Sequence, residues 1–355
     1  ALPISNILSI GSGRDYKHLE KGNIPVFGTG GYMTSVNECI YDGETTFIGR
    51  KGSINKPFYY NGKFWTVDTL FYTHSFNKTT PKFVYCLFQT INWLRYNEAS
   101  GVPSLSKDTI EKIKVFIPQL DEQRKISEML SVIDERIATQ NKIIEKLQSL
   151  IRGLSDNIHR DIKGETVCFS GVGEAYSGLS GKSGDDFGDG EPFITYMNVY
   201  QNTYISEKDY EFVQIAPNER QNCVQYGDAL FTLSSETPEE VGIGAVYLGN
   251  TQKLYLNSFC FGIHFYDERV LPQYLAHFIS SFSFRKAIYP LAQGSTRFNL
   301  QKNDFMKMKF VLPTLEEQER IAKTLDALHY CMANEKSLLE QYILLKRYLL
   351  SQMFI

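Results

Sequence analysis

The sequence lacks the features of a membrane or secreted protein. No apolar run approaches the roughly 18 residues that a membrane-spanning helix needs. Nothing at the N-terminus resembles a charged segment followed by a long apolar one, and the cysteines form no C-x-x-C pair. The six cysteines are Cys39, Cys86, Cys168, Cys223, Cys260 and Cys331. We therefore expect a reduced, cytoplasmic protein.

The motifs of common catalytic and metal sites are also missing. The six histidines are dispersed, with no H-E-x-x-H and no His/Cys cluster at metal-binding spacing. The segments FGTGG at 27–31 and FSGVG at 169–173 both mimic the glycine turn of methyltransferase cofactor loops, but no [ND]PP[YF] tetrad is present to hold a flipped base. The G-K-S sequence at 181–183 fails as a phosphate-binding loop because Tyr176 stands where its first glycine is required. We expect a non-catalytic chain with no cofactor or metal of its own.

Three acidic clusters have two interpretations each. Asp121-Glu122 and Glu316-Glu317 could form acid–base pairs, but their place in the first turn of a predicted helix favours complementing the helix dipole. The acidic segment 185–191 could bind a divalent cation, whereas its composition favours a solvated loop.

Charge is unevenly distributed along a chain that is long enough for more than one core. With 355 residues, 43% hydrophobic and 14% aromatic, the chain exceeds what a single core usually organises. The net charge is −3, but residues 1–118 hold 13 Lys and Arg against 9 Asp and Glu, whereas 161–312 hold 12 against 18. A near-neutral chain can still bind DNA where its basic groups meet phosphates, so charge alone neither indicates nor excludes a nucleic-acid partner.

An internal repeat is the most informative feature of the sequence. The segment KVFIPQLDEQRKISEML at 114–130 matches KFVLPTLEEQERIAKTL at 309–325, an offset of 195 residues. Each copy contains an apolar strand, a proline that ends it, an acidic first helical turn and a long helix. A repeat of this kind predicts two copies of one structural unit.

Both predicted helices carry apolar residues at heptad spacing, which we call the seam. The first seam comprises Ile126, Leu130, Ile133, Ile137, Ile144, Leu147, Ile151, Leu154 and Ile158. The second comprises Ile321, Leu325, Leu328, Met332, Leu339, Tyr342, Leu349 and Met353. Polar residues interrupt the two seams at Gln140 and Glu335, again 195 residues apart.

So narrow a stripe fits burial against one partner helix. The other copy in the same chain is the nearest partner, which predicts an intramolecular coiled coil. A helix of about 40 residues would be roughly 60 Å long. A coiled coil between two identical chains is the alternative, and the polar interruptions fit either.

The segments before each helix predict two versions of one β-rich domain. Apolar runs bounded by turns include IPVFGTGGY, ETTFIGRKGSI and KPFYYNGKFWTVDTLFYTH in the first, and EPFITYMNVY, YGDALFTLSS, GIGAVYLGN and KLYLNSFCFGIHF in the second. An aromatic helical stretch follows each, at 81–97 and 271–289. We predict an α+β fold with β-rich domains at 1–118 and 161–312, and long helices at 119–160 and 313–355.

This layout resembles the specificity subunits of type I restriction-modification enzymes over essentially the whole chain. The resemblance rests on the two P-x-L-[DE]-E-Q helix starts at Pro118 and Pro313, the loops before them, and the segment FGTGGYMTSVNECIYDGETTFIGRKGSINKPFYYNGKFWTVDTLF. It implies that two target recognition domains each bind half of a split DNA site. Two long antiparallel helices would space these domains and dock methyltransferase (modification) subunits. The chain is short for the family and opens directly inside the first recognition domain.

Base recognition uses polar side chains on loops that enter a groove, above all Arg, Lys, Asn and Gln. Glycine-marked turns with polar or basic residues supply the candidates. In the first domain they are Thr29, Tyr32, Arg50, Lys51, Ser53 and Lys56. In the second they are Lys182, Ser183, Asn198, Ser234, Ser235, Thr237 and Arg297. Any one of them could instead be an ordinary solvated turn residue.

The resemblance implies a DNA-binding specificity subunit that recognises a split, asymmetric site in double-stranded DNA. Its expected partners are two methyltransferase subunits and the restriction (translocase-nuclease) subunits. S-adenosylmethionine, ATP and Mg²⁺ would be bound by those partners. Two alternatives remain: a coiled-coil protein–protein scaffold without DNA recognition, and the recognition half of another split restriction-methylation enzyme.

Overall fold

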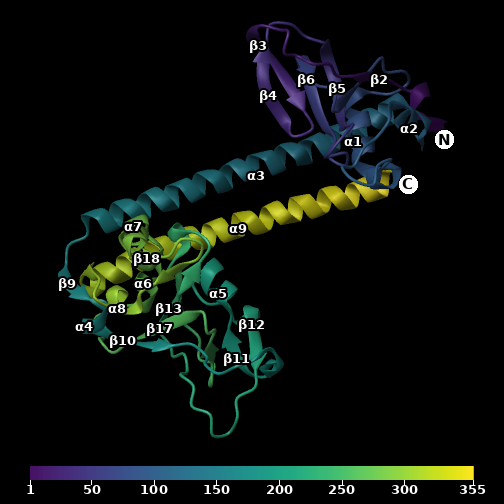
Figure 1. The fold of residues 1–355 in the computed structure, drawn as a ribbon. Coiled ribbons are helices and arrows are strands. Elements are labelled where there is room, and N and C mark those ends of the chain that lie inside the picture. The colour runs from purple at the N-terminus through teal and green to yellow at the C-terminus, as the bar shows by residue number, and fades with distance from the viewer. Residues whose placement is uncertain (355) are drawn as a thin grey trace. The chain divides into compact units, whose positions relative to one another are not determined.

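The computed structural model describes residues 1–354 and divides into two compact units (Figure 1). Unit 1 comprises Ala1–Lys142 and the C-terminal residues from Lys336 onward, and unit 2 comprises Ile143–Glu335. Each unit therefore contains one globular domain and half of each long helix. Within residues 1–354, no helix is long and apolar enough to cross a membrane.

Domain 1, the globular part of unit 1, is built on a six-stranded sheet of order β2-β7-β5-β6-β3-β4. The strands of this sheet are β2 (Ser9–Ser12), β3 (Lys21–Gly28), β4 (Gly31–Val36), β5 (Tyr41–Gly49), β6 (Phe58–Thr66) and β7 (Leu70–His74). Two further strands of domain 1, β1 (Leu2–Pro3) and β8 (Lys114–Val115), pair with each other. All pairings in the six-stranded sheet are antiparallel except that of β3 with β6, in which Val26 pairs with Trp65. The predicted runs therefore form one curved, mostly antiparallel layer.

Helices close one side of domain 1 and bury its core. They are η1 (Ile4–Asn6), α1 (Pro81–Thr90), η2 (Trp93–Tyr96) and α2 (Lys107–Lys112). Thr80 begins α1 by accepting a hydrogen bond from the Phe83 amide, and Pro81 occupies the first turn, where a missing N–H costs nothing. Phe88 and Trp93 are fully buried beneath this layer. The aromatic stretch predicted as helical thus supplies the core.

Domain 2, the globular part of unit 2, uses four smaller sheets. Its strands are β9 (Glu165–Cys168), β10 (Gly173–Ser177), β11 (Phe187–Ile194), β12 (Tyr210–Val213), β13 (Ala229–Thr232), β14 (Ser234–Ser235), β15 (Gly244–Val246), β16 (Tyr255–Leu256), β17 (Cys260–Phe265), β18 (Ala292–Gln293), β19 (Phe298–Leu300) and β20 (Lys309–Leu312). Its helices are α4 (Phe169–Val172), η3 (Gly184–Asp186), α5 (Tyr196–Gln201), η4 (Glu207–Asp209), η5 (Pro238–Glu240), α6 (Pro272–Ser280), α7 (Phe282–Ile288), η6 (Tyr289–Leu291) and α8 (Lys302–Met306).

Strand pairings show that the two domains are versions of one fold. The parallel pair β11–β16 of domain 2, with Phe193 opposite Tyr255, corresponds to the parallel pair β3–β6 of domain 1. Likewise β10-β17-β13 has the same antiparallel order as β2-β7-β5. The long strand β6 corresponds to two short strands, β15 and β16. The internal repeat predicted from the sequence is confirmed.

The two predicted long helices are observed as α3 (Leu120–Asp161) and α9 (Leu315–Met353). In unit 1 the start of α3 packs against the end of α9: Lys346 forms an ion pair with Asp134, and the Phe354 ring stacks on Phe83 with centroids 5.3 Å apart. In unit 2 the opposite ends meet, because Ile158 and Ile321 pack on the same core. The helices are therefore antiparallel in each unit, and all predicted seam residues are buried or half-buried within one chain.

A buried glutamine explains the repeated P-x-L-[DE]-E-Q motif. Gln123 has no exposed surface; its Nε2 donates to the carbonyls of Lys78 and Pro118, both at 2.9 Å. Its Oε1 accepts a hydrogen bond from the backbone N of Thr80 at 3.1 Å, and Thr80 is the residue that caps α1. The side chain thus joins the start of α3 to the loop before α1.

Gln318 makes the equivalent contacts in unit 2. Its Nε2 donates to the carbonyls of Arg269 at 2.7 Å and Pro313 at 2.8 Å, and its Oε1 accepts from Leu271 N at 2.8 Å. Like Gln123, it is fully buried. The motif therefore fastens each long helix to the domain that precedes it.

One predicted run differs in detail. The segment EPFITYMNVY was expected to be extended, but the strand ends at Ile194 and residues 196–201 form α5. Thr195 causes the change, because its side chain accepts a hydrogen bond from Asn198 N at 3.1 Å and caps the helix. Strand-forming residues after a capping threonine were mistaken for one continuous strand.

Candidate nucleic-acid interface

In domain 1, three chain segments meet beside the ends of β3 and β5, and we call them loop cluster 1: residues 28–32, 50–56 and 98–104. Gly52 N donates to Pro103 O at 2.8 Å, and Leu105 N donates to Arg50 O at 2.9 Å. A Cβ at Gly52 would lie 3.8 Å from Thr29 Oγ1, so the hairpin turn lies against the second segment. Gly52 has φ +83°, which glycine adopts at little cost. Backbone contacts thus fix the shape of the cluster.

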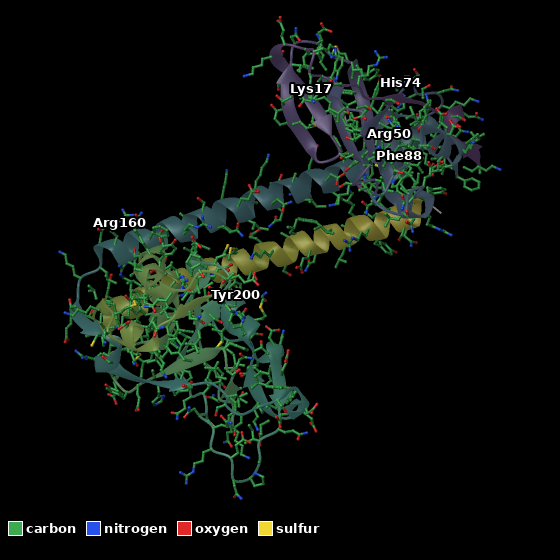
Figure 2. The ribbon with its side chains drawn as sticks, viewed as in Figure 1. Lys17, Arg50, His74, Phe88, Arg160 and Tyr200 are labelled. Atoms are coloured by element: carbon green, nitrogen blue, oxygen red, sulfur yellow. The ribbon has the colours of Figure 1, made fainter. Side chains whose placement is uncertain are left out.

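All six residues predicted in domain 1 lie on or beside loop cluster 1. Lys51 and Lys56 are exposed, and Tyr32 is 64% exposed at the hairpin. Arg50 is half-buried: its Nη1 donates to Asp68 O at 3.3 Å, and its guanidinium lies 6.0 Å from the Phe71 ring centroid (Figure 2). Thr29 and Ser53 are half-buried between them. The cluster therefore presents basic and hydroxyl groups on a fixed backbone.

In domain 2, the corresponding loop cluster 2 comprises α5, residues 234–240, residues 293–298 and Phe259. These segments surround an open pocket of about 400 Å³. The pocket is lined by Tyr196, Met197, Tyr200, Ser234, Ser235, Glu236, Glu240, Phe259 and Arg297. Only one of these side chains, that of Arg297, is basic.

Hydrogen bonds hold the 234–240 loop in place. Tyr200 donates to Glu240 at 2.5 Å and Thr237 donates to the same carboxylate at 2.9 Å, so these bonds lower the pKa of Glu240 (Figure 2 labels Tyr200). The hydrogen bond between Tyr200 and Glu240 also raises the pKa of Tyr200. Ser235 Oγ donates to the Thr237 carbonyl. Glu240 is therefore an ionised anchor for the loop.

Tyr196 fixes the loop to α5 from the other side. Its hydroxyl donates to Ser234 O at 2.8 Å, and burial raises its pKa. Its ring stacks on Tyr200 with centroids 6.0 Å apart and an interplanar angle of 18°. The pocket therefore has one wall of packed aromatic rings.

Two charged side chains of the pocket remain available to a ligand. Arg297 is exposed, lies 5.8 Å above the ring of Phe259 and forms no ion pair with any residue in the range 1–354. Glu236 is exposed and likewise has no hydrogen-bond or ion-pair partner among those residues. One donor group and one acceptor group thus face solvent from a rigid frame.

The two clusters are equivalent in their backbone connections. Arg50 N donates to Thr69 O in domain 1, as Leu233 N donates to Phe259 O in domain 2. The bridge between Lys51 and Ser104 corresponds to the pairing of Ser234 with Asn299. The same loops in both domains therefore form the candidate interface, although few of their residues are alike.

The structure places three predicted residues of domain 2 in internal contacts. The Lys182 side chain is 8% exposed, and its ammonium donates to Glu219 at 2.6 Å and to Gln214 O at 2.5 Å. Asn198 is 2% exposed and bonds both its amide groups to the backbone of Ser206. Lys182 and Asn198 are therefore not part of the proposed interface.

Ser183 also makes a local contact, whereas the other four predicted residues belong to loop cluster 2. The Ser183 hydroxyl donates to Asp186 at 2.9 Å across η3. Ser234 and Ser235 line the pocket although they are only 7% and 6% exposed, Thr237 orders the loop and Arg297 is free. Their contact with DNA stays a prediction.

Sequence reasoning missed the aromatic and acidic part of the pocket. The sequence pattern places Tyr196, Met197 and Tyr200 in the apolar run EPFITYMNVY and Phe259 in the run KLYLNSFCFGIHF, and predicts neither run as part of a site. Glu236 was passed over because acidic residues are less usual base partners than Arg, Lys, Asn and Gln. The signal that could have found Phe259 is its 190-residue offset from Thr69, which lies beside Arg50.

The two glycine segments at 27–31 and 169–173 lie in different local structures. Phe27–Gly31 is the β3–β4 hairpin, and Phe169 begins the four-residue helix α4. Within residues 1–354, no three His, Cys, Asp or Glu side chains are grouped as metal ligands. What the loop clusters offer is hydrogen-bond donors, acceptors and apolar surface.

The family described as the type I restriction modification DNA specificity domain matches residues 4–149 and 165–342. The chain belongs to this DNA specificity family. The two matched segments coincide with the two copies of the internal repeat, so each copy is one specificity domain with its helix. The family assignment confirms the role that the resemblance implied for this protein, which is recognition of DNA sequence within a type I restriction-modification complex.

Individual relatives of this specificity protein are distant. It is 22% identical over 341 residues to a putative type I restriction enzyme specificity subunit of Haemophilus influenzae, covering 86% of this chain and 80% of that one. It is 24% identical over 273 residues to the MjaVIII specificity subunit of Methanocaldococcus jannaschii, covering 69% of this chain and 62% of the relative.

Solved structures confirm the fold of this specificity protein. The S subunit of a type I system from M. genitalium matches with a TM-score of 0.67 and 14% identity, covering 99% of this chain and 95% of that chain. A chain from a solved type I R-M complex matches with a TM-score of 0.59 and 14% identity. The α+β prediction with two β-rich domains and two long antiparallel helices is therefore confirmed.

Proposed function

We propose that this chain recognises a split, asymmetric site in double-stranded DNA, binding one half-site with each loop cluster. It performs no catalysis and positions two methyltransferase subunits on the bound DNA. Restriction subunits join the complex, and the partners carry S-adenosylmethionine, ATP and Mg²⁺. These finer points go beyond the family assignment.

One observation carries the proposal: the two clusters have the same backbone connections but different chemistry. Loop cluster 1 presents Arg50, Lys51 and Lys56, whereas loop cluster 2 presents Arg297 with Glu236 beside aromatic rings. Equivalent positions on two copies of one fold suit equivalent tasks, and different side chains suit different bases. The two half-sites should therefore differ in sequence.

The charge distribution indicates that the two domains contribute unequally to the affinity for DNA. Residues 1–118 have a net charge of +4, whereas residues 161–312 have a net charge of −6. Binding to phosphates grows with the number of basic contacts and weakens with salt. Domain 1 should therefore contribute more salt-dependent affinity, and domain 2 should depend on its partner subunit to approach DNA.

Exposed apolar side chains outside the seams support docking of the methyltransferase subunits on the long helices. After the first turn of each helix they are Met129, Val132, Ile143 and Leu150 on α3, and Tyr330, Leu338, Leu344, Leu345 and Tyr348 on α9. Exposed apolar stripes on a helix commonly mark a protein interface. A scaffold without DNA recognition would use the same stripes, but it would leave the two loop clusters without a role.

Reconstitution with the methyltransferase subunit of the same restriction-modification system tests the proposal. The complex would be expressed in a methylation-free host, and modified bases would be mapped across the genome. We expect one motif with two unlike half-sites separated by a fixed gap. Unmethylated DNA, or methylation without a shared motif, would overturn the proposal.

A further inference from the structure

The pocket of loop cluster 2 combines one free cation and one free anion, which is an unusual pair for a DNA-facing surface. Arg297 and Glu236 both line it, and neither forms an ion pair with the other or with any residue from 1 to 354. A carboxylate beside DNA is repelled by the phosphates, so its presence needs a compensating contact. The exocyclic amino group of a base is the donor that a carboxylate finds in the major groove.

The position of Glu236 is fixed by its neighbours on both sides. Ser235 bonds to the carbonyl of Thr237, and Thr237 bonds to Glu240, which is held in turn by Tyr200. Among the charged side chains of this stretch, Glu236 is the one that lines the pocket without a hydrogen-bond or ion-pair partner in the range 1–354. A rigid loop that presents one unsatisfied acceptor suits selective hydrogen bonding, because little entropy is lost when the ligand binds.

Arg297 is similarly prepared for a planar partner. Its guanidinium lies 5.8 Å from the ring centroid of Phe259, a cation–π arrangement that restricts a long side chain. Guanidinium groups bind guanine O6 and N7 through two parallel hydrogen bonds. The ring of Phe259 is itself 54% exposed, so the arginine is supported without being buried.

We propose that Glu236 and Arg297 recognise one G·C base pair in the half-site bound by domain 2, with Glu236 accepting from cytosine N4 and Arg297 donating to guanine O6 and N7. Cytosine fits better than adenine because adenine carries the N7 acceptor beside its amino group, which would repel a carboxylate. This inference rests on the proposed function. It adds two specificity-determining residues and the base pair that they select.

Domain 1 has different residues at the equivalent positions, so the two domains should not select the same base pair. Matching the strand pairings places Ser53 of domain 1 at the position of Glu236, with Lys51 at the position of Ser234. The Lys51 ammonium accepts no hydrogen bond, and the Ser53 hydroxyl, which donates as well as accepts, does not select for a donor such as cytosine N4. The G·C preference should therefore be confined to the half-site of domain 2.

The test uses the full methyltransferase complex and a duplex bearing the motif found in the genome. Each cytosine of the half-site is replaced in turn by pyrimidin-2-one, which lacks the N4 amino group, and affinity is measured by fluorescence anisotropy. Wild-type complex should lose roughly 5- to 150-fold in affinity at one cytosine. The Glu236→Ala variant, which has no side-chain acceptor, should show no further loss at that cytosine, because the contact is already absent.

Matched variants separate base recognition from charge and folding effects. Glu239→Ala removes an exposed carboxylate from the same loop, but Glu239 does not line the pocket, so the cytosine selectivity should persist. Arg297→Ala should reduce discrimination at the guanine of the same pair. A loss of affinity that is the same for all sequences, with the slope of log affinity against log salt reduced by about one, would instead indicate a phosphate contact. That result would overturn the role of Arg297 in base recognition.

Failure of this inference is distinguishable from failure of the proposed function. If the wild-type complex yields a split motif but Glu236→Ala retains full discrimination at every position, the inference is wrong and the proposed function stands. If the wild-type complex yields no motif, the proposed function is wrong. Retention of the domain 1 half-site in the variants' methylated genome shows that the variant chains fold and assemble.

Discussion

The Nε2 atom of His277 lies 2.8 Å from the Asp326 carboxylate, joining α6 of domain 2 to α9. His277 is 3% exposed, Tyr204 donates to the same carboxylate at 2.7 Å, and His329 stacks on the imidazole with centroids 5.4 Å apart. Burial lowers the pKa of His277, with Asp326 opposing and His329 and His159 adding to the shift. The neutral imidazole is therefore the form that fits, donating from Nε2.

This pairing predicts that unit 2 loses stability in mild acid. The unfolded chain binds a proton near pH 6.5 and the folded His277 only at lower pH, so stability is fully present above about pH 6.5 and declines below it. His159, 8% exposed and packed on Tyr274, has its pKa lowered by burial and acts in the same direction. The urea midpoint of unfolding should be lower at pH 5.5 than at pH 7.5.

Two variants check the origin of that loss. His159→Phe should fold and reduce the pH dependence, because Phe354 occupies the equivalent position in unit 1, stacked on Phe83. His18→Asn, at an exposed histidine of domain 1, should leave the dependence as it is. Equal loss in the wild type and in a His159→Phe/His277→Gln double variant would contradict the assignment.

Removing the buried glutamines should destabilise the chain. Gln123→Ala leaves Thr80 N and the carbonyls of Lys78 and Pro118 without their partner, at about 1–3 kcal/mol for each group that stays unpaired. Thermal unfolding followed by circular dichroism should show a clearly lower midpoint. Gln119→Ala, at an exposed position one turn earlier, is the control and should change little; similar midpoints for both variants would refute the structural role of the motif.

Arg50→Ala with Lys51→Ala should damage recognition of one half-site only. Both residues lie on loop cluster 1, so methylation mapping should show relaxed bases in the domain 1 half-site and an unchanged domain 2 half-site. The control is Lys63→Ala with Lys82→Ala, which removes the same charge from exposed positions outside the cluster. Loss of both half-sites in the first variant but not in the control would argue against separate recognition by the two domains.

Shortening the helices should change the gap between half-sites. Removing four residues from the 137–150 stretch of α3 shortens that helix by roughly 6 Å, about two base pairs of DNA. Removing seven residues from the middle of both helices keeps the two seams in register and should shorten the gap further. In each case the half-site sequences should stay as they are; altered half-sites in the methylated genome would show that the helices do not set the spacing.

The fold was predictable because its signals are periodic and repeated. The heptad seam from Ile126 to Ile158 and its copy from Ile321 to Met353 define both helices, and the 195-residue offset relates the two domains. The hairpin turn at Thr29-Gly30 and the strand before Arg50 followed from turn residues between apolar runs. Each of these features depends on local sequence alone.

The candidate site was only partly predictable because it depends on long-range contacts. Nothing near Lys182 in the sequence indicates that its ammonium is bound by Glu219, 37 residues away. Tyr196 and Phe259 meet Arg297 only because three separate loops converge on one pocket. Exposed arginine and lysine are found from residue type, whereas an isolated glutamate such as Glu236 becomes significant only when its neighbours are seen to be satisfied.

The central claim is that the two loop clusters independently recognise unlike half-sites, and exchange of one cluster tests it most directly. Domain 2, residues 165–312, would be replaced by a second copy of domain 1, residues 1–118, joined at the matching β9 and β1 positions, and the hybrid complex would be mapped by genome-wide methylation sequencing. We predict a motif in which the domain 1 half-site occurs twice, in inverted orientation, because the helices are antiparallel. A motif that still contains the original second half-site would contradict the account.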